Sequence, residues 1–241
     1  MHAVDPGMNG ATREGKVLFE QLGGGLERGG TREQHLSAYL LALYLKDSEL
    51  SRHSRLVQYL ASRLARALAL SKRERTIIAQ AALLHDLGKI MLPDALLQKA
   101  SPLTTEEFAL IKLHPACGAL LLTEAQGLGD VALLVYHHHE RWDGGGYPLG
   151  LRREAIPPGA RIVAVADAFE AMTSHRPYQR RRTTEEALAE LRRCAGRQFD
   201  PSLVHQFCTL LEKGSLEQRQ REAGADVNRL FSSIYAQHVL L

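Results

Sequence analysis

The sequence of 241 residues contains little cysteine and no long apolar run, and both absences narrow the kinds of protein that it encodes. Its three cysteines, Cys117, Cys194 and Cys208, are odd in number and far apart. This usage argues against a disulfide framework and predicts reduced thiols in a cytoplasmic protein. No apolar run approaches the roughly 18–20 residues of a membrane span. The sequence also lacks a signal peptide, so we expect a protein without a membrane span.

A strong charge of one sign is also missing. The chain has 30 lysine and arginine residues against 27 acidic ones, which gives a net charge of +3 and an isoelectric point near 8.8. Such mild basicity does not indicate binding to a nucleic-acid polymer, although it is compatible with a local basic pocket for a phosphorylated ligand. Hydrophobic residues make up 45% of the chain and charged residues 24%, and this balance supports a packed core.

No segment shows the alternation of apolar and polar residues that marks a half-buried strand. From His35 onward the apolar residues recur with helical spacing, and we therefore expect an all-α protein. Serine, threonine or aspartate precedes several of these runs, in some cases with glutamate three residues later, which is typical of capped helix starts. The expected helix caps are Ser71, Thr104, Asp130, Thr183 and Asp200.

The composition divides the chain into three parts. Residues 1–34 are rich in glycine and poor in apolar periodicity, so we expect a flexible or docking segment. Residues 35–213 carry the helical pattern and are expected to form a single helical domain. Residues 214–241 form a polar tail, with a further helix possible at 227–240.

The stretch His85-Asp86-Leu87-Gly88-Lys89 closes an apolar helical run at residues 77–84. An aspartate at such a place is able to bridge two metal ions while the preceding histidine binds one of them. Gly88 then permits a tight turn, and Lys89 brings a cation back toward the same point. The pair His85-Asp86 alone is weak evidence, because such pairs occur by chance in many chains.

Its weight comes from further histidines and carboxylates, several of them adjacent, among the 11 histidines of the chain. A single helical histidine is more often a core or surface residue than a ligand. A set of nitrogen and oxygen ligands without cysteine suits iron, manganese or another first-row ion better than a structural zinc. His137 is interpreted as a neighbour rather than a ligand. The candidate metal ligands are His53, His85, Asp86, His114, His138, His139 and Asp167.

Over roughly residues 39–212 the chain resembles the HD-GYP domain family, a bacterial branch of the HD metal-dependent phosphohydrolases. The resemblance implies an α-helical domain that hydrolyses cyclic di-GMP to pGpG, and in some cases on to GMP. It also implies two or three bound metal ions, often iron or manganese. The stretches that carry it are His85–Lys89, His138–Pro148, Ala160–Asp167, Thr173–Tyr178 and Phe199–Pro201.

The resemblance implies roles for two acidic residues before the histidine at position 53. Glu49 precedes His53 by one helical turn, so one helix face would carry both side chains. In family members with three metals, a glutamate at this place is a ligand. The alternative is an ordinary solvated acid at a helix start. Asp47 matches a family position near the substrate or the metals.

Two cations are candidate phosphate binders, as the resemblance implies. These are Lys89 and Arg176, and we expect Asp86 and Lys89 to take part in catalysis. The family commonly has another basic residue soon after Arg-Pro-Tyr, whereas this chain has Gln179 there. This departure concerns substrate affinity rather than the metal site, and the arginines at 180–182 are potential substitutes.

The loop that gives the family its name contains Gly144, Gly146, Tyr147 and Pro148. Its glycines allow close backbone approach, and Tyr147 offers a ring and a hydroxyl. The alternative interpretation is a purely structural role, in which the loop is a turn and the tyrosine packs against the protein. The resemblance suggests contact with the ligand or with a GGDEF-domain partner.

The sequence therefore predicts a metal-dependent cyclic di-GMP phosphodiesterase. Two alternatives come from other classes of protein. One is a cyclic di-GMP sensor without turnover, or an interaction module for a GGDEF protein, and the intact ligand set argues against it. The other is a phosphohydrolase for another nucleotide, and the Gly-Tyr-Pro loop argues against that, because general HD phosphohydrolases need no such loop.

Overall fold

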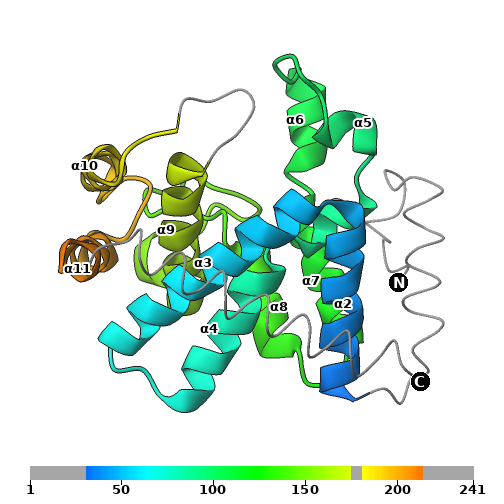
Figure 1. The fold of residues 1–241 in the computed structure, drawn as a ribbon, viewed down its shortest axis with the longest axis horizontal. Helices are drawn as coiled ribbons and strands as arrows, with labels where there is room; N and C mark the ends of the chain where they lie inside the picture. The colour runs from blue at the N-terminus through cyan, green and yellow to red at the C-terminus, as the bar shows by residue number, and fades with distance from the viewer. Residues whose placement is uncertain (1–30, 175–180, 214–241) are drawn as a thin grey trace, which may run out of the picture.

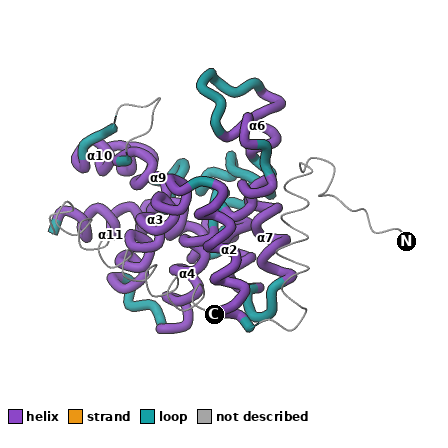
Figure 2. Tube along the Cα trace, turned by 45° about the vertical axis from the view of Figure 1, so that its right-hand side comes forward, coloured by secondary structure: helices purple, strands orange, loops and turns teal. Residues whose placement is uncertain are grey.

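The computed structural model describes residues 31–174 and 181–213. Within these residues the only β pairing is an isolated bridge between Ala195 and Phe199, and Figure 2 shows helices joined by loops. The expected all-α fold is therefore confirmed. The helices are α2 (Arg32–Lys46), α3 (Ser48–Ala67), α4 (Lys72–Leu84), η1 (Leu87–Met91), α5 (Asp94–Leu97), α6 (Thr105–Ile111), α7 (His114–Glu124), α8 (Gly129–His137), η2 (Arg153–Ala155), α9 (Pro158–Thr173), α10 (Thr184–Cys194) and α11 (Pro201–Glu212).

The longest described helix, α3, packs against both α4 and α9, while α7 packs against α8 and η1. Figure 1 shows α10 and α11 on one side of this central group and α5 and α6 rising above α7 on the other. Large apolar side chains from most of these helices are fully buried between them. The largest include Phe169, Phe207, Leu64, Leu84 and Leu122.

Most of the expected helix caps are confirmed. Ser71, Thr104 and Thr183 each accept a hydrogen bond from the backbone N–H three residues later, where a glutamate completes a capping box. Asp200 accepts from the backbone of Ser202 at 2.9 Å. Such caps depend on neighbours within one turn, so the local sequence is sufficient to specify them.

Two expected helix starts were wrong. Asp130 lies inside the first turn of α8, whose N-cap is Leu128, and its carboxylate pairs with Arg73 of α4 instead. The first described helix begins at Arg32 rather than at residue 35, because Thr31 and the glutamine at 34 form a capping box. The second described helix begins at residue 48, because Asp47 caps it.

Several expectations lie outside the described residues. They concern most of the segment 1–34, the tail at 214–241 with its helix at 227–240, and the two side chains Arg176 and Gln179. Of the helices in residues 31–174 and 181–213, none has both the length and the apolar character needed to cross a membrane.

Gly88 lies in a tight turn, closed by the N–H of Lys89 donating to the carbonyl of Asp86 at 2.9 Å, and it also serves a close approach. It is not among the glycines with positive φ, so the turn itself does not require glycine there. A Cβ atom at this position would lie 2.0 Å from the carbonyl oxygen of His114 and 2.6 Å from the nitrogen of Gly118. The segment η1 therefore lies directly on the backbone of α7, with no room for a side chain between them.

We expect Gly88→Ala to lower the free energy of unfolding by about 2 kcal/mol or more, because the new methyl group meets rigid backbone. The measurement is chemical denaturation. Gly129→Ala is the matched control, because a Cβ at Gly129 meets nothing within 4 Å, and its stability should match or exceed that of the parent. Equal stability of the two variants would contradict the close contact between η1 and α7.

Candidate metal centre

Three buried histidines stand at helix ends that meet at one place. His85 follows the last residue of α4, His114 is the first residue of α7, and His138 follows the last residue of α8. In each case the ring nitrogen Nδ1 donates to the backbone carbonyl three residues earlier, which fixes the orientation of the ring. These bonds are His85 Nδ1 to Ala82 O at 2.8 Å, His114 Nδ1 to Ile111 O at 2.7 Å, and His138 Nδ1 to Val135 O at 2.6 Å.

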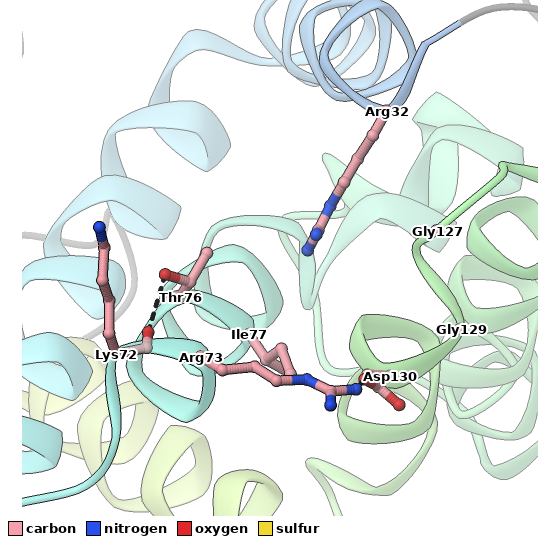
Figure 3. Close-up of a pocket in the computed structure, with 8 residues that line it drawn as sticks. All are labelled: Arg32, Lys72, Arg73, Thr76, Ile77, Gly127, Gly129 and Asp130. Carbon is pink, nitrogen blue, oxygen red and sulfur yellow. Dashed lines mark hydrogen bonds and ion pairs between the residues drawn. The ribbon is translucent and has the colours of Figure 1, made fainter.

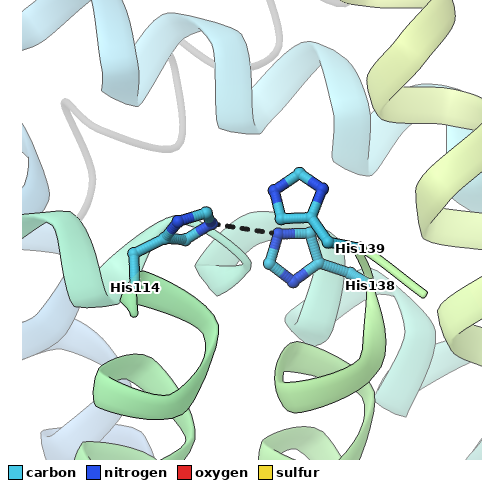
Figure 4. Close-up of side chains that lie close together, drawn as sticks. All are labelled: His114, His138 and His139. Carbon is cyan, nitrogen blue, oxygen red and sulfur yellow. Dashed lines mark hydrogen bonds between the residues drawn. The ribbon is translucent and has the colours of Figure 1, made fainter. Parts of the chain in front are cut away.

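A neutral imidazole that donates through Nδ1 has a bare lone pair on Nε2. The Nε2 atoms of His114 and His138 lie 3.3 Å apart, and Figure 4 shows His114 pointing from α7 toward the rings of His138 and His139. The Nε2 atoms of His53 and His85 lie 3.2 Å apart. Lone pairs that face at such distances repel unless a cation shares them. This donor chemistry fits a metal centre.

Asp86 lies between the two pairs of histidines. One of its oxygens, Oδ1, is 3.4 Å from Nε2 of His114, and the other, Oδ2, is 3.4 Å from Nε2 of His85. Asp167 adds a carboxylate oxygen 3.2 Å from Nε2 of His53. Two groups of side chains are therefore able to hold metal, each with ligand atoms within 4.8 Å of one another. They are His53 with His85 and Asp86, and His114 with His138 and His139.

Burial and charge set the protonation of these groups. Burial lowers the pKa of His114 to about 3, against the opposing effect of Asp86, and it lowers the pKa of His138 strongly. Burial alone would raise the pKa of Asp86, but Lys89 and the surrounding histidines hold it well below its usual range. Neutral imidazoles next to an ionised carboxylate are the form that metal ligands require.

His53 differs from the other histidines because two carboxylates face it. Burial favours its neutral form, but hydrogen bonds with Asp167 and Glu170 outweigh this and raise its pKa to about 9. The carboxylates therefore favour a positive charge at this point. A proton on His53 and a metal ion beside it are alternative ways of supplying that charge.

Glu170 is a residue of this site that the sequence analysis missed. It is buried on α9, one turn after Asp167, and its carboxylate accepts a hydrogen bond from Nδ1 of His53 and another from the hydroxyl of Ser174. Glu170 thereby fixes the orientation of the His53 ring, as backbone carbonyls do for the other three histidines. The spacing of Asp167 and Glu170 on one helix face was a signal that could have found it.

Glu140 was also missed as a structural residue, although it lies within a quoted motif. Its buried carboxylate accepts hydrogen bonds from the backbone N–H of Leu149 at 2.8 Å and of Leu151 at 2.9 Å. In addition, the backbone N–H of Tyr147 donates to the carbonyl of His139 at 3.2 Å. These bonds hold the Gly-Tyr-Pro loop against the end of α8.

The loop brings Tyr147 to the edge of the histidine cluster. Its ring centroid lies 4.9 Å from that of His139, and Nζ of Lys112 lies 5.5 Å from the tyrosine ring. Burial raises the pKa of Tyr147, and the charges of two nearby carboxylates raise it further, so its hydroxyl stays protonated. The preceding Gly146 allows this approach, because a Cβ there would lie 2.4 Å from the backbone nitrogen of Arg141.

The other candidate residues lie in different surroundings. Nζ of Lys89 is 2.8 Å from Oδ2 of Asp86, as expected of a cation returning to the site. Glu49 is not in either ligand group among the described residues, and its exposed side chain pairs with Arg52 at 2.9 Å. Asp47 caps α3 by accepting from the N–H of Glu49 at 2.8 Å.

His137 belongs to neither ligand group of the described residues. Its Nδ1 lies 3.6 Å from the Glu140 carboxylate and has no hydrogen-bond partner among the described residues. This position agrees with its interpretation as a neighbour.

Comparison with known proteins gives one matching family and several relatives. Residues 40–203 match the HD domain family. The chain is 41% identical over 185 residues to a cyclic di-GMP phosphodiesterase of Thermotoga maritima. The aligned region covers 76% of this chain and 50% of the relative. It is 45% identical over 171 residues to the cyclic di-GMP phosphodiesterase response regulator RpfG of Xanthomonas campestris pv. campestris, covering 70% of this chain and 45% of the relative.

The chain thus spans about half the length of these curated relatives. Among solved structures, the cyclic GMP-AMP specific phosphodiesterase V-cGAP3 of V. cholerae superposes with a TM-score of 0.57 at 19% identity. The match covers 77% of this chain and 52% of that one. At this level of identity the likeness establishes the fold alone.

We expect Glu140→Ala to lower the free energy of unfolding by about 3 kcal/mol, because two backbone N–H groups lose a charged acceptor. Amide hydrogen exchange at Leu149 and Leu151 should also become faster. The control is Glu154→Ala, an exposed glutamate of the neighbouring η2, which should change neither quantity. Unchanged exchange at both leucines in Glu140→Ala would show that Glu140 does not hold the loop.

Proposed function

Because the chain belongs to the HD domain family, we propose that it is a metal-dependent phosphodiesterase that hydrolyses cyclic di-GMP. The observation that carries this proposal is the position of Asp86, whose two oxygens face Nε2 atoms of histidines in two separate groups. A carboxylate with this surrounding suits two neighbouring ions, which is the arrangement that phosphoester hydrolysis uses. The names of the curated relatives support the choice of substrate.

The candidate ligands would hold two metal ions, and iron or manganese suits a set of nitrogen and oxygen donors. A third ion with Glu49 as ligand is a further prediction, as is a cytoplasmic location. When bound, the ions would activate a water for attack on phosphorus and offset charge on the phosphoryl oxygens. His139 and Asp167 complete the candidate set beside the histidines already described, and Glu170 would keep His53 oriented by accepting its Nδ1–H.

The chain's own cations and loop would bind and position the substrate. Lys89 lies beside Asp86 and would donate to a phosphoryl oxygen. Tyr147 lies beside the ring of His139 and would offer its protonated hydroxyl and its ring to the ligand. Arg176 remains a predicted phosphate binder on the strength of its motif. The exposed Leu149 at the end of the same loop supports a surface for a GGDEF-domain partner.

A second substrate class has a specific observation in its favour. The V. cholerae protein of similar fold is named a cyclic GMP-AMP specific phosphodiesterase. A 3'3'-cGAMP-specific phosphodiesterase of Vibrio cholerae is 36% identical to this chain over 165 residues, below the 41% and 45% of the two cyclic di-GMP phosphodiesterases. Turnover of the two cyclic dinucleotides should therefore be compared side by side, and we expect cyclic di-GMP to be preferred.

We expect Asp86→Ala and Asp86→Asn to reduce metal content and to lower turnover of cyclic di-GMP more than a hundredfold. The reason is that a carboxylate shared by two ions is lost from both. The measurements are elemental analysis of protein purified without oxygen and a turnover assay. Asp94→Ala, which changes an exposed carboxylate paired with Lys46, should retain both properties. Full metal content and normal turnover in both Asp86 variants would refute the site.

We expect Lys89→Ala to keep its metal and to lose about ten- to a hundredfold in kcat/KM, the loss expected for one ionic hydrogen bond to substrate. The matched control is Lys99→Ala, since that lysine is equally half-buried and pairs with Glu107 instead. Metal loss in Lys89→Ala would assign the lysine to support of Asp86. Unchanged kinetics would remove it from the substrate site.

A further inference from the structure

A pocket of about 780 Å³ lies at the opposite end of α4 from the candidate metal centre. It is lined by Lys72 and Arg73, the first two residues of that helix, whereas His85 follows its last residue. Thirteen residues separate the two ends, which corresponds to about 20 Å at the rise of an α-helix. The volume is in the range of sites for small molecules.

Three of the four charged residues that line this pocket are cationic. Arg32, Lys72 and Arg73 face it with a single carboxylate among the lining residues, that of Asp130. Arg73 and Asp130 pair at 2.8 Å, as Figure 3 shows. The charges of Arg32 and Lys72 are left without an acidic partner in the lining, so the pocket attracts anions.

These cations stand where the helices themselves disfavour them. Arg32 is the first residue of α2, and Lys72 and Arg73 open α4. The N-terminus of a helix carries a partial positive charge, and acidic rather than basic residues stabilise it. A bound anion would offset both the basic side chains and the helix ends.

Arg32 contains a donor that lacks an acceptor. Figure 3 shows its side chain reaching from α2 toward the space between α4 and the Gly127–Gly129 segment. One terminal nitrogen donates to Oε1 of Gln80, but Nε is buried and has no partner among the described residues. Nε is thus closed off from the pocket, but no acidic side chain of the lining offsets the charge of the Arg32 guanidinium, and an anion in the pocket would do so.

The start of α8 also opens on this pocket. Its N-cap, Leu128, provides no side-chain hydrogen bond, whereas α2 and α4 both have complete capping boxes. The first N–H groups of α8, at Gly129 and Asp130, have no acceptor within the helix. A Cβ on Gly129 would meet nothing within 4 Å, so this end of the helix faces open space. Uncapped N–H groups of this kind bind phosphate.

We propose that this pocket is a second ligand site, separate from the metal centre, that binds a small molecule bearing a phosphate group. Arg32 would donate from its guanidinium group to a phosphate oxygen, and the first N–H groups of α8 would donate to another. Lys72 and Arg73 would add charge at the rim. The proposal does not depend on the activity at the metal centre, because no residue is shared between the two sites.

The test is calorimetric titration of the full chain with inorganic phosphate and, separately, with GMP. Binding should persist in Asp86→Ala, which damages the metal centre, and should weaken at least tenfold in Arg32→Gln. Arg75→Gln is the matched control, because Arg75 lies on α4 but does not line the pocket, and it should bind as the parent does. Tighter binding of GMP would identify a nucleotide as the ligand, and equal binding would identify the phosphate group alone.

A second pair of variants separates binding from folding. Gly129→Asp places a carboxylate at the start of α8, where it stabilises the helix but occupies the anion position. We expect thermal stability equal to or above that of the parent, with at least tenfold weaker binding of both probes. Gly129→Ala should bind normally. Absence of saturable heat with both probes would overturn the proposal, as would binding that survives Gly129→Asp but is lost in Asp86→Ala.

Discussion

The candidate site depends on one constraint, the fixed orientation of its imidazole rings. Three of them donate from Nδ1 to a backbone carbonyl three residues earlier, at the point where a helix begins or ends. Each Nε2 lone pair is thereby directed at the same buried space, and Asp86 fills the middle of it. Asp86 meets both groups because the missing side chain at Gly88 lets η1 lie directly on α7. A contact between two backbones thus sets the relation between the two halves of the site.

The arrangement is costly in the absence of a cation. Buried carboxylates and imidazoles with facing lone pairs would be replaced by apolar side chains if stability alone were optimised. Their cost is kept low by a second layer of partners. Lys89 pairs with Asp86, and Glu170 pairs with His53 and Ser174. The fold therefore maintains an anionic, electron-rich centre that attracts metal ions, and its helices are packed around that requirement.

Much of the fold and of the candidate site was predictable from the sequence, because the relevant signals are local. Capping boxes lie within one turn, and the candidate ligands stand in compact motifs, so the all-α fold and the resemblance to HD-GYP proteins are confirmed. Several roles that the sequence did not reveal are set by distant segments. Asp130 pairs across to α4 instead of capping its own helix, and Gly88 is required by α7 rather than by its own turn. The structural role of Glu140 depends on the Gly-Tyr-Pro loop, whose following backbone N–H groups donate to its carboxylate.

The two ends of α4 favour nearby charges of opposite sign. Its C-terminal end has a partial negative charge and leads into His85 and Asp86, where cations are favoured. Its N-terminal end has a partial positive charge, yet it begins with Lys72 and Arg73. The acid that helps this end most directly, Glu74, is used in the capping box with Ser71. Arg73 is offset by its pair with Asp130 of α8, whereas the charge of Lys72 is offset neither by the helix nor by its cap. The anion that we propose for the pocket would offset that remaining charge.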